Sequence, residues 1–237
     1  MSGARETILG RVAEALKLAA PPPRLSSASK ADAAGKADAA GKAGASGKAA
    51  RAWLPDGGET PEERLALLSG NLAKLGAGFV RSSDEAAAAR ALADLASRRG
   101  WKRVAAHRSE LLTAVLAPLG VERWDVEDGF NKWRLEGCDA GITTCRVLVA
   151  QTGSILVSSA DDGGRAISVL PPVHVVVART EQVVCDLDDA MAQLQSPTGA
   201  LPSMLSFITG PSRTGDIERI LVLGAHGPKE LLVMLIG

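Results

Sequence analysis

The sequence of 237 residues has little cysteine, no excess of charge of either sign and no long apolar run. Its three cysteines, Cys138, Cys145 and Cys185, are too few and too scattered for a disulfide framework, and an odd number leaves one unpaired in an oxidising compartment. No two of them form a Cys-x-x-Cys pair, the usual ligand spacing of an iron-sulfur cluster or a structural zinc. The cysteine content therefore predicts a cytoplasmic protein without such a metal centre.

The balance of charge excludes a general attraction to nucleic acid. Lys plus Arg number 27, as do Asp plus Glu, so only a local patch could bind a polyanion or an anionic membrane. No apolar run approaches the ~20 residues that a membrane span needs, and the first residues lack the continuous apolar core of a signal peptide. With 46% hydrophobic residues, the chain is expected to be soluble with one sizeable core.

Recognisable cofactor motifs are also missing. There is no Gly-x-Gly-x-x-Gly fingerprint for a dinucleotide. The stretch from Gly35 to Lys42, "GKADAAGK", is one residue too long between its glycines for a phosphate-binding P-loop, and Ala43 follows where Ser or Thr is needed. We therefore identify no place in the sequence for a cofactor.

Composition divides the chain into three expected segments. Apolar residues recur at helical spacing between Ile8 and Leu16, so residues 1–20 are predicted to hold an amphipathic helix. Residues 21–55 begin with three prolines and repeat Ala, Gly and Lys with almost nothing to bury, which predicts a low-complexity linker. Residues 56–237 are expected to form one α/β domain.

The alternation of helical and strand patterns predicts the fold class of that domain. Thr60 and Glu63 form a capping box for a helix to about residue 75, and Ser82 and Glu85 are expected to begin a second helix that stops at Gly100. Short strands lie between the helices, which favours a parallel sheet. Further on, two strand patterns flank "QTG", and strands outnumber helices. The expected fold is α/β, with a mixed, mostly parallel sheet flanked by helices.

Two glycine-containing loops near the C-terminus carry candidate ligand-binding residues. A strand, "LSFIT", leads to a turn at Gly210, after which donor and acidic side chains crowd before an expected helix near residues 215 and 216. One interpretation is an anion site; the other is a helix cap in which Arg213 pairs with an acidic neighbour. A second loop places a histidine between glycines. The candidates are Gly210, Ser212, Arg213, Thr214, Asp216 and His226.

The turn "QTGS" and a later glycine-rich loop give the remaining candidates. The turn is either a tight hairpin or a place where Gln151, Thr152, Gly153 and Ser154 face a ligand. Arg165 follows two glycines and is either a lid cation for an acidic ligand or a partner of neighbouring aspartates. A structural role is expected for His174, and no functional role is assigned to His107.

Together these motifs resemble one protein family. Gly141-Ile142-Thr143, "AQTGS", "LPPVH", "GPSRTGDIE" and "GAHGP" occur in an order similar to that of the lactate-utilisation protein C family, the LUD-domain proteins. The resemblance covers about residues 60 to 237 and the N-terminal helix, and it adds Thr143 to the candidates. It implies a fold like that of the phosphosugar isomerases and CoA transferases.

The resemblance also implies a role in oxidising L-lactate to pyruvate with iron-sulfur partner proteins. The family often has Glu where this chain has Gln151, and an amide cannot act as a carboxylate base or nucleophile. The chain alone is not expected to oxidise lactate. Three hypotheses remain: a ligand-binding component of the system, a non-catalytic assembly or regulatory subunit, and a CoA-transferase-like or isomerase-like enzyme for another acyl or phosphorylated substrate.

Overall fold

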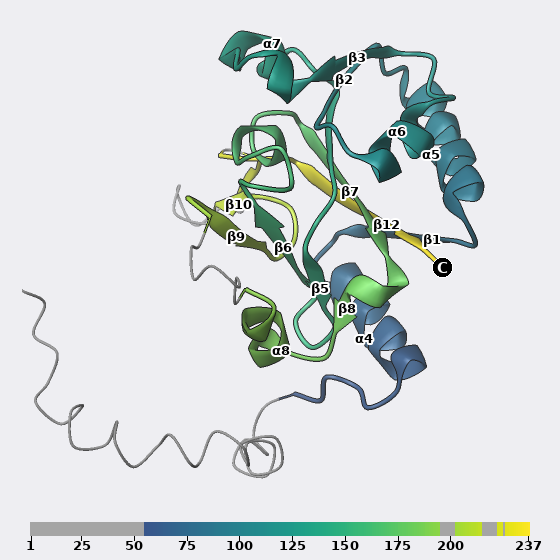
Figure 1. Ribbon diagram of the computed structural model, residues 1–237, viewed down its shortest axis with the longest axis vertical. Helices are drawn as coiled ribbons and strands as arrows, with labels where there is room; N and C mark the ends of the chain where they lie inside the picture. Colours follow the sequence, from purple (N-terminus) through teal and green to yellow (C-terminus); the bar gives the residue numbers. More distant parts are fainter. Residues whose placement is uncertain (1–54, 195–201, 215–221, 225) are drawn as a thin grey trace, which may run out of the picture. The chain divides into compact units, whose positions relative to one another are not determined.

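The computed structural model describes residues 55–194, 202–214, 222–224 and 226–237 (Figure 1). The expected N-terminal helix, nearly all of the linker and the helix start expected near residues 215 and 216 lie outside these residues. Within the described part of the chain, no helix has the length and apolar character needed to cross a bilayer.

Helices and strands alternate through the first half, and strands dominate the second. The α-helices are α4 (Pro61–Lys74), α5 (Glu85–Arg99), α6 (Glu110–Leu116), α7 (Lys132–Glu136) and α8 (Leu187–Ala192), with short 3-10 turns η1 (Val126–Asp128), η2 (Ala166–Ser168) and η3 (Thr180–Gln182). The strands are β1 (Gly78–Ser82), β2 (Arg103–Ala106), β3 (Glu122–Asp125), β4 (Ala140–Thr143), β5 (Val147–Val149), β6 (Ser154–Ser158), β7 (Val173–Arg179), β8 (Val183–Val184), β9 (Leu205–Ile208), β10 (Arg213–Thr214), β11 (Val222–Leu223) and β12 (Glu230–Ile236).

A six-stranded parallel sheet forms the centre of the domain. Its order is β1-β12-β7-β4-β2-β3, and every neighbouring pair is parallel. A separate four-stranded sheet, β8-β5-β6-β9, contains two antiparallel pairs, and β10 pairs with β11 as a two-stranded ribbon. The expectation of a mostly parallel α/β fold with helices around the sheet is confirmed.

Alternating side chains on the parallel strands form two cores, because successive residues of a strand point to opposite faces. On β7, Val175 and Val177 pack with α5 and α6, whereas Val176 and Ala178 pack with α4 and the β5–β6 hairpin. The second face continues under α7, where Ala105 packs against Trp124, Leu135 and Ile167. Strands buried on both faces have near-continuous apolar sequences, as β7 does.

Local capping signals set the helix boundaries. The predicted box at α4 is present: the Thr60 hydroxyl accepts from the Glu63 amide at 3.2 Å, and Pro61 occupies the first turn. The predicted start of α5 at Ser82 is wrong, because Ser82 is the last residue of β1 and is buried. Asp84 caps α5 instead, accepting from the Ala87 amide at 2.7 Å.

Candidate functional site

Neighbouring strands β2 and β4 send the chain to opposite faces of the parallel sheet. After β2 the chain enters α6, which packs on the first face, and after β4 it enters the β5–β6 hairpin on the second. Such a switch opens a crevice outside the carboxyl ends of the strands, where α/β proteins commonly bind ligands. His107 follows β2 directly, and Thr144 follows β4.

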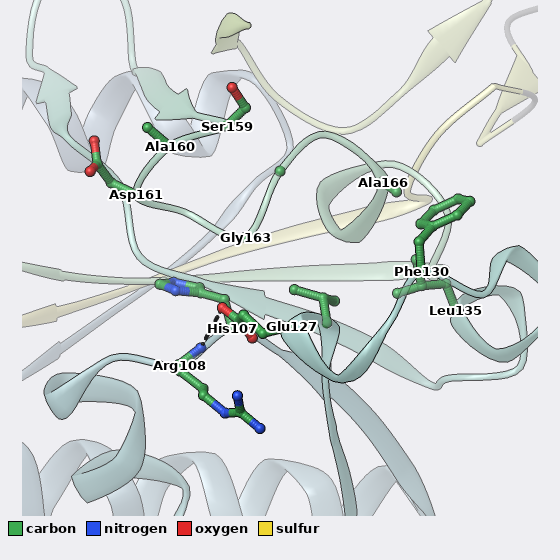
Figure 2. Close-up of a pocket in the computed structure, with 12 residues that line it drawn as sticks. His107, Arg108, Glu127, Phe130, Leu135, Ser159, Ala160, Asp161, Gly163 and Ala166 are labelled. Carbon is green, nitrogen blue, oxygen red and sulfur yellow. Dashed lines mark hydrogen bonds between the residues drawn. The ribbon is translucent and has the colours of Figure 1, made fainter. Parts of the chain in front are cut away.

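A cavity of about 380 Å³ lies at this edge of the sheet, within the range of small-molecule sites. We call it the carboxyl-end cavity. Figure 2 shows Phe130, Leu135 and Ala166 on one side of it and Ser159, Ala160 and Asp161 on the other. Its walls come from the segments after β2 and β3, from α7 and from the loop after β6: His107, Arg108, Val126, Glu127, Phe130, Leu135, Ser159, Ala160, Asp161, Gly163, Gly164 and Ala166.

A hydrogen-bonded group of three residues supports the wall at His107. The Thr144 amide donates to His107 Nε2 at 3.1 Å, so this nitrogen carries the lone pair and the neutral ring has its proton on Nδ1. The Thr144 hydroxyl lies 3.0 Å from the same nitrogen and donates to Asp162 Oδ1 at 2.6 Å. The other oxygen of Asp162 accepts from the Ser158 amide at 2.8 Å.

Burial shifts the pKa of both ionisable members of this group. Burial lowers the pKa of His107, and the negative charge of Asp162 opposes that change. Burial raises the pKa of Asp162, while hydrogen bonds from Thr144 and Ser158 oppose the rise. The two shifts favour the uncharged forms, so we expect His107 to be a neutral hydrogen-bonding residue near pH 7.

Charges at the cavity have partners on the protein, with one exception close by. Arg108 pairs with Asp128, its amide donates to Glu127 at 3.0 Å, and Asp161 pairs with Arg146 at 2.9 Å. Arg165 is exposed between cavity residues Gly164 and Ala166, and its guanidinium makes no hydrogen bond or ion pair with the described residues. The predicted loop cation therefore lies next to the cavity.

The other glycine turns meet somewhere else, around the end of α4. Gly153 and Gly210 both have positive φ, and a Cβ at either would lie 3.1–3.2 Å from the Leu75 side chain. The Arg213 guanidinium donates to the Leu75 carbonyl, a favourable position for a cation because helix C-termini carry partial negative charge. The turn and the loop at Gly210 are thus brought together, as a single site requires.

Hydrogen bonds within the protein already use the polar groups of the QTGS turn. Thr152 donates to Ser154 Oγ at 2.8 Å, and Ser154 Oγ lies 2.8 Å from the Thr209 hydroxyl. The Gln151 side chain donates to the Pro55 carbonyl at 2.5 Å. Among the predicted ligand groups, those of this turn therefore have structural partners.

The two C-terminal loops are joined through Ser212. Its amide donates to the Pro228 carbonyl at 2.9 Å, and its carbonyl accepts from the Gly224 amide at 2.9 Å. This pairing places the exposed His226 on the loop that faces Ser212. Thr214 is the second residue of β10, which pairs with β11, while its side chain and Asp216 lie outside the described residues.

Strand β6 separates Arg165 from the QTGS turn. Ser154 begins this strand, whereas Ser158 ends it and leads to the cavity loop. Five residues of strand span roughly 15 Å at about 3.3 Å each, so the turn and the cavity lie at opposite ends of β6. The predicted residues therefore divide between two places.

The Thr143 side chain forms its hydrogen bond within the sheet. Its hydroxyl lies 2.9 Å from His174 Nε2, and both side chains are buried. Among the described side chains, His174 Nδ1 is the buried polar atom without a hydrogen-bond partner. Burial lowers the pKa of His174 to about 4.

This buried histidine predicts a loss of stability in acid. The unfolded chain protonates this histidine below a pKa of about 6.5, whereas the folded protein keeps it neutral down to about 4. The free energy of unfolding is therefore highest above pH 6.5 and falls as the pH is lowered toward 4. Between pH 6.5 and 5, the unfolding free energy of His174→Gln should fall less steeply than that of the parent protein, by about 1 kcal/mol per pH unit. Urea denaturation at several pH values measures this; equal slopes in both proteins contradict it.

One group of described residues has the composition of a metal site. Ligand atoms of Cys185, Asp186 and Asp189 lie within 4.8 Å of one another. Asp186 caps α8 by accepting from the Asp189 amide at 2.9 Å. This contact accounts for the approach of the two residues as a helix cap.

Sequence reasoning missed His107 and the contribution of Asp162. The useful signal was positional: His107 follows the last residue of a short apolar strand that belongs to a parallel sheet. Residues at that position lie at the edge where α/β proteins bind ligands. Asp162 had no comparable signal, since its partners Thr144 and Ser158 are identified only by the fold.

The fold and the cavity define an α/β protein with a candidate ligand site at the carboxyl ends of a parallel sheet. Residues 65–236 match the LUD domain model, and the chain belongs to the LUD domain family. A crystal structure of a DUF162 family protein from Deinococcus radiodurans has a similar fold, with a TM-score of 0.58, 24% sequence identity, and coverage of 76% of this chain and 100% of that one.

Several relatives come from bacteria and have descriptive names. Lactate utilization protein C of Bacillus subtilis is 32% identical over 121 residues, covering 49% of this chain and 50% of that protein. The protein of the same name in Deinococcus radiodurans is 37% identical over 105 residues, covering 44% of this chain and 49% of that protein. The chain thus spans about half the length of these curated relatives.

Proposed function

We propose that this chain is a cytoplasmic component of an L-lactate utilisation system, in which iron-sulfur partner proteins oxidise L-lactate to pyruvate, and that it binds an anion beside the carboxyl-end cavity. The similarity to proteins named lactate utilization protein C supports the biological role. The observation that carries ligand binding is the exposed Arg165 on the cavity loop, whose guanidinium has no partner among the residues that the structure describes.

The backbone of this loop adds donors for an anion. Gly163 and Gly164 line the cavity with φ of +76° and +82°, and their amides make no hydrogen bond with the described residues. Glycine allows a ligand to approach the backbone closely, and successive free amides commonly bind anions. Arg165 supplies the charge, and a guanidinium can hold a carboxylate or phosphate by two parallel bonds.

The assignment of electron transfer to partner proteins follows from the chemistry of the cysteines. Cys138, Cys145 and Cys185 are all buried and form no disulfide with one another, and burial raises the pKa of Cys138 and Cys145. Cluster ligands are thiolates, so these environments oppose the required form. The chain then contributes ligand binding or assembly to the system.

A second candidate anion site is the loop that holds Ser212 and Arg213. The Arg213 guanidinium donates at least one hydrogen bond to the Leu75 carbonyl, but the side chain is exposed and lies near the loop of His226. This site is the one expected from the motif "GPSRTGD". A non-catalytic assembly role, or a CoA-transferase-like reaction, would use either location differently.

Reconstitution of the system tests the proposal. We expect the isolated chain not to reduce a dye with L-lactate, and the purified iron-sulfur partners to lose rate when the chain is omitted. Arg165→Ala should reproduce most of that loss by raising the Kd for the anion at least about tenfold, since charge-assisted hydrogen bonds contribute about 1.5 to 3 kcal/mol. The measurement is L-lactate-dependent dye reduction.

Arg213→Ala is the comparison variant, because both arginines are exposed and each belongs to one of the two candidate anion sites. It should leave the rate near that of the parent chain. The reverse pattern, a loss with Arg213→Ala alone, assigns the anion to the second candidate site. An unchanged rate when the whole chain is omitted contradicts the proposed function.

A further inference from the structure

Phe130 is a large aromatic side chain exposed at the lip of the carboxyl-end cavity. The chain has only three Phe, four Trp and no Tyr, yet Phe130 is 73% exposed while lining the cavity. In Figure 2 its ring lies beside Leu135 and Ala166, which extend the apolar wall. An aromatic ring at the mouth of a site provides a face on which a flat ligand can stack.

The segment that carries Phe130 is held in place before any ligand arrives. Glu127 accepts from the Arg108 amide at 3.0 Å, and Asp128 pairs with the Arg108 guanidinium. Gly129 then turns the chain with φ of +124° and presents the next residue. A side chain placed by a fixed segment loses less entropy when it binds, which favours its use in recognition.

The size of the cavity also bears on the ligand. A volume of about 380 Å³ corresponds to roughly a dozen water molecules at about 30 Å³ each. A three-carbon hydroxy acid has six non-hydrogen atoms and would leave about half of that space to water. The cavity therefore accommodates a larger molecule than lactate.

We propose that the carboxyl-end cavity binds a molecule that joins a planar aromatic ring to an anionic group, the chemistry of a nucleotide. The ring stacks on Phe130, and the anion lies against the Gly163 and Gly164 amides and Arg165. Val126, Leu135 and Ala166 give the ring an apolar surround. The inference rests on the proposed anion site and adds the ring.

Three probes separate the two parts of this ligand. Adenosine 5′-monophosphate has both ring and phosphate, ribose 5-phosphate lacks the base, and adenosine lacks the phosphate. We expect the monophosphate to bind about 5- to 160-fold more tightly than ribose 5-phosphate, the range that stacking of a base on an aromatic side chain provides. Isothermal titration calorimetry on the full chain measures all three.

Two variants assign the contacts. Phe130→Ala should remove most of the difference between the monophosphate and ribose 5-phosphate, and its exposed position leaves the fold intact, which thermal denaturation checks. Trp133→Ala is the matched control: Trp133 is 77% exposed three residues away and does not line the cavity. It should leave the three affinities unchanged.

The outcomes for the ring and for the anion are distinct. Equal affinities for the monophosphate and ribose 5-phosphate, or no change with Phe130→Ala, overturn the ring site but leave the anion site standing if Arg165→Ala weakens both. No heat from the monophosphate at millimolar concentration overturns this inference. The role in lactate utilisation is judged separately, by omission of the chain from the reconstituted system.

Discussion

Asp162→Ala is expected to lower the free energy of unfolding by about 3 to 4 kcal/mol. The carboxylate is 2% exposed and accepts from the Ser158 amide and the Thr144 hydroxyl. Its removal leaves two donors without an acceptor, and a buried unsatisfied donor costs about 1–3 kcal/mol. Urea denaturation followed by circular dichroism measures the change.

The adjacent residue provides the control for this experiment. Asp161 is exposed and pairs with Arg146 at 2.9 Å on the surface. Surface ion pairs contribute about 0–1 kcal/mol, so Asp161→Ala should change stability by no more than that. Similar losses for the two variants would show that the loop depends on charge in general and not on the hydrogen bonds of Asp162.

Gly141→Ala is expected to destabilise the protein by about 3 kcal/mol. Gly141 lies in β4, and a Cβ there would come 2.1 Å from the Ile167 carbonyl oxygen and 3.1 Å from Pro171 Cγ. The first of these neighbours is backbone and cannot turn aside as a flexible side chain can. Relief of the clash requires a shift of η2 from the sheet, and overpacking of this kind costs about 1–3 kcal/mol or more.

A glycine in open surroundings provides the contrast. Gly70 is exposed within α4, and nothing lies within 4 Å of a Cβ built there. Gly70→Ala should therefore stabilise the protein by about 0.5–1 kcal/mol, because alanine is the better helix former. Thermal and urea denaturation of both variants tests the pair; a stable Gly141→Ala protein would contradict the close approach of η2 to β4.

The close approach at Gly141 also bears on the cavity. Ile167 belongs to η2, which directly follows the loop of Gly163, Gly164 and Arg165. A shift of η2 would move that loop, so Gly141→Ala should weaken ligand binding as well as stability. The glycine was noticed in the sequence only as part of a family motif; its physical reason is the carbonyl that it lets approach.

Local signals were enough to predict most of the helices and strands. The box of Thr60 and Glu63 predicted α4 because capping depends on residues three apart in sequence. Gly100, with φ of +65°, ended α5 for an equally local reason. The misplaced start of α5 at Ser82 shows the limit of this approach. Several neighbouring polar residues can cap a helix, and only the pairing of Ser82 with Ile236 shows that Ser82 belongs to the sheet.

Candidate site residues were predictable as residue types but not as a set. The sequence contained Arg165, the QTGS turn and Arg213 as possible ligand groups, and only the path of β6 and the end of α4 divided them between two places. Arg213 could have paired with an acidic neighbour or an anion. Its contact with the Leu75 carbonyl joins residues 138 positions apart, which no local pattern specifies.

By itself, the sequence determined the α/β class, the hairpin at "QTG" and the capped helix α4, because periodicity, turn residues and caps act over a few residues. The tertiary structure alone decided the carboxyl-end cavity. His107, Thr144 and Asp162 meet only because β2 and β4 are neighbours in the sheet and their connections leave on opposite faces. Strand order depends on packing over the whole domain, so residues far apart in sequence acquire their roles together.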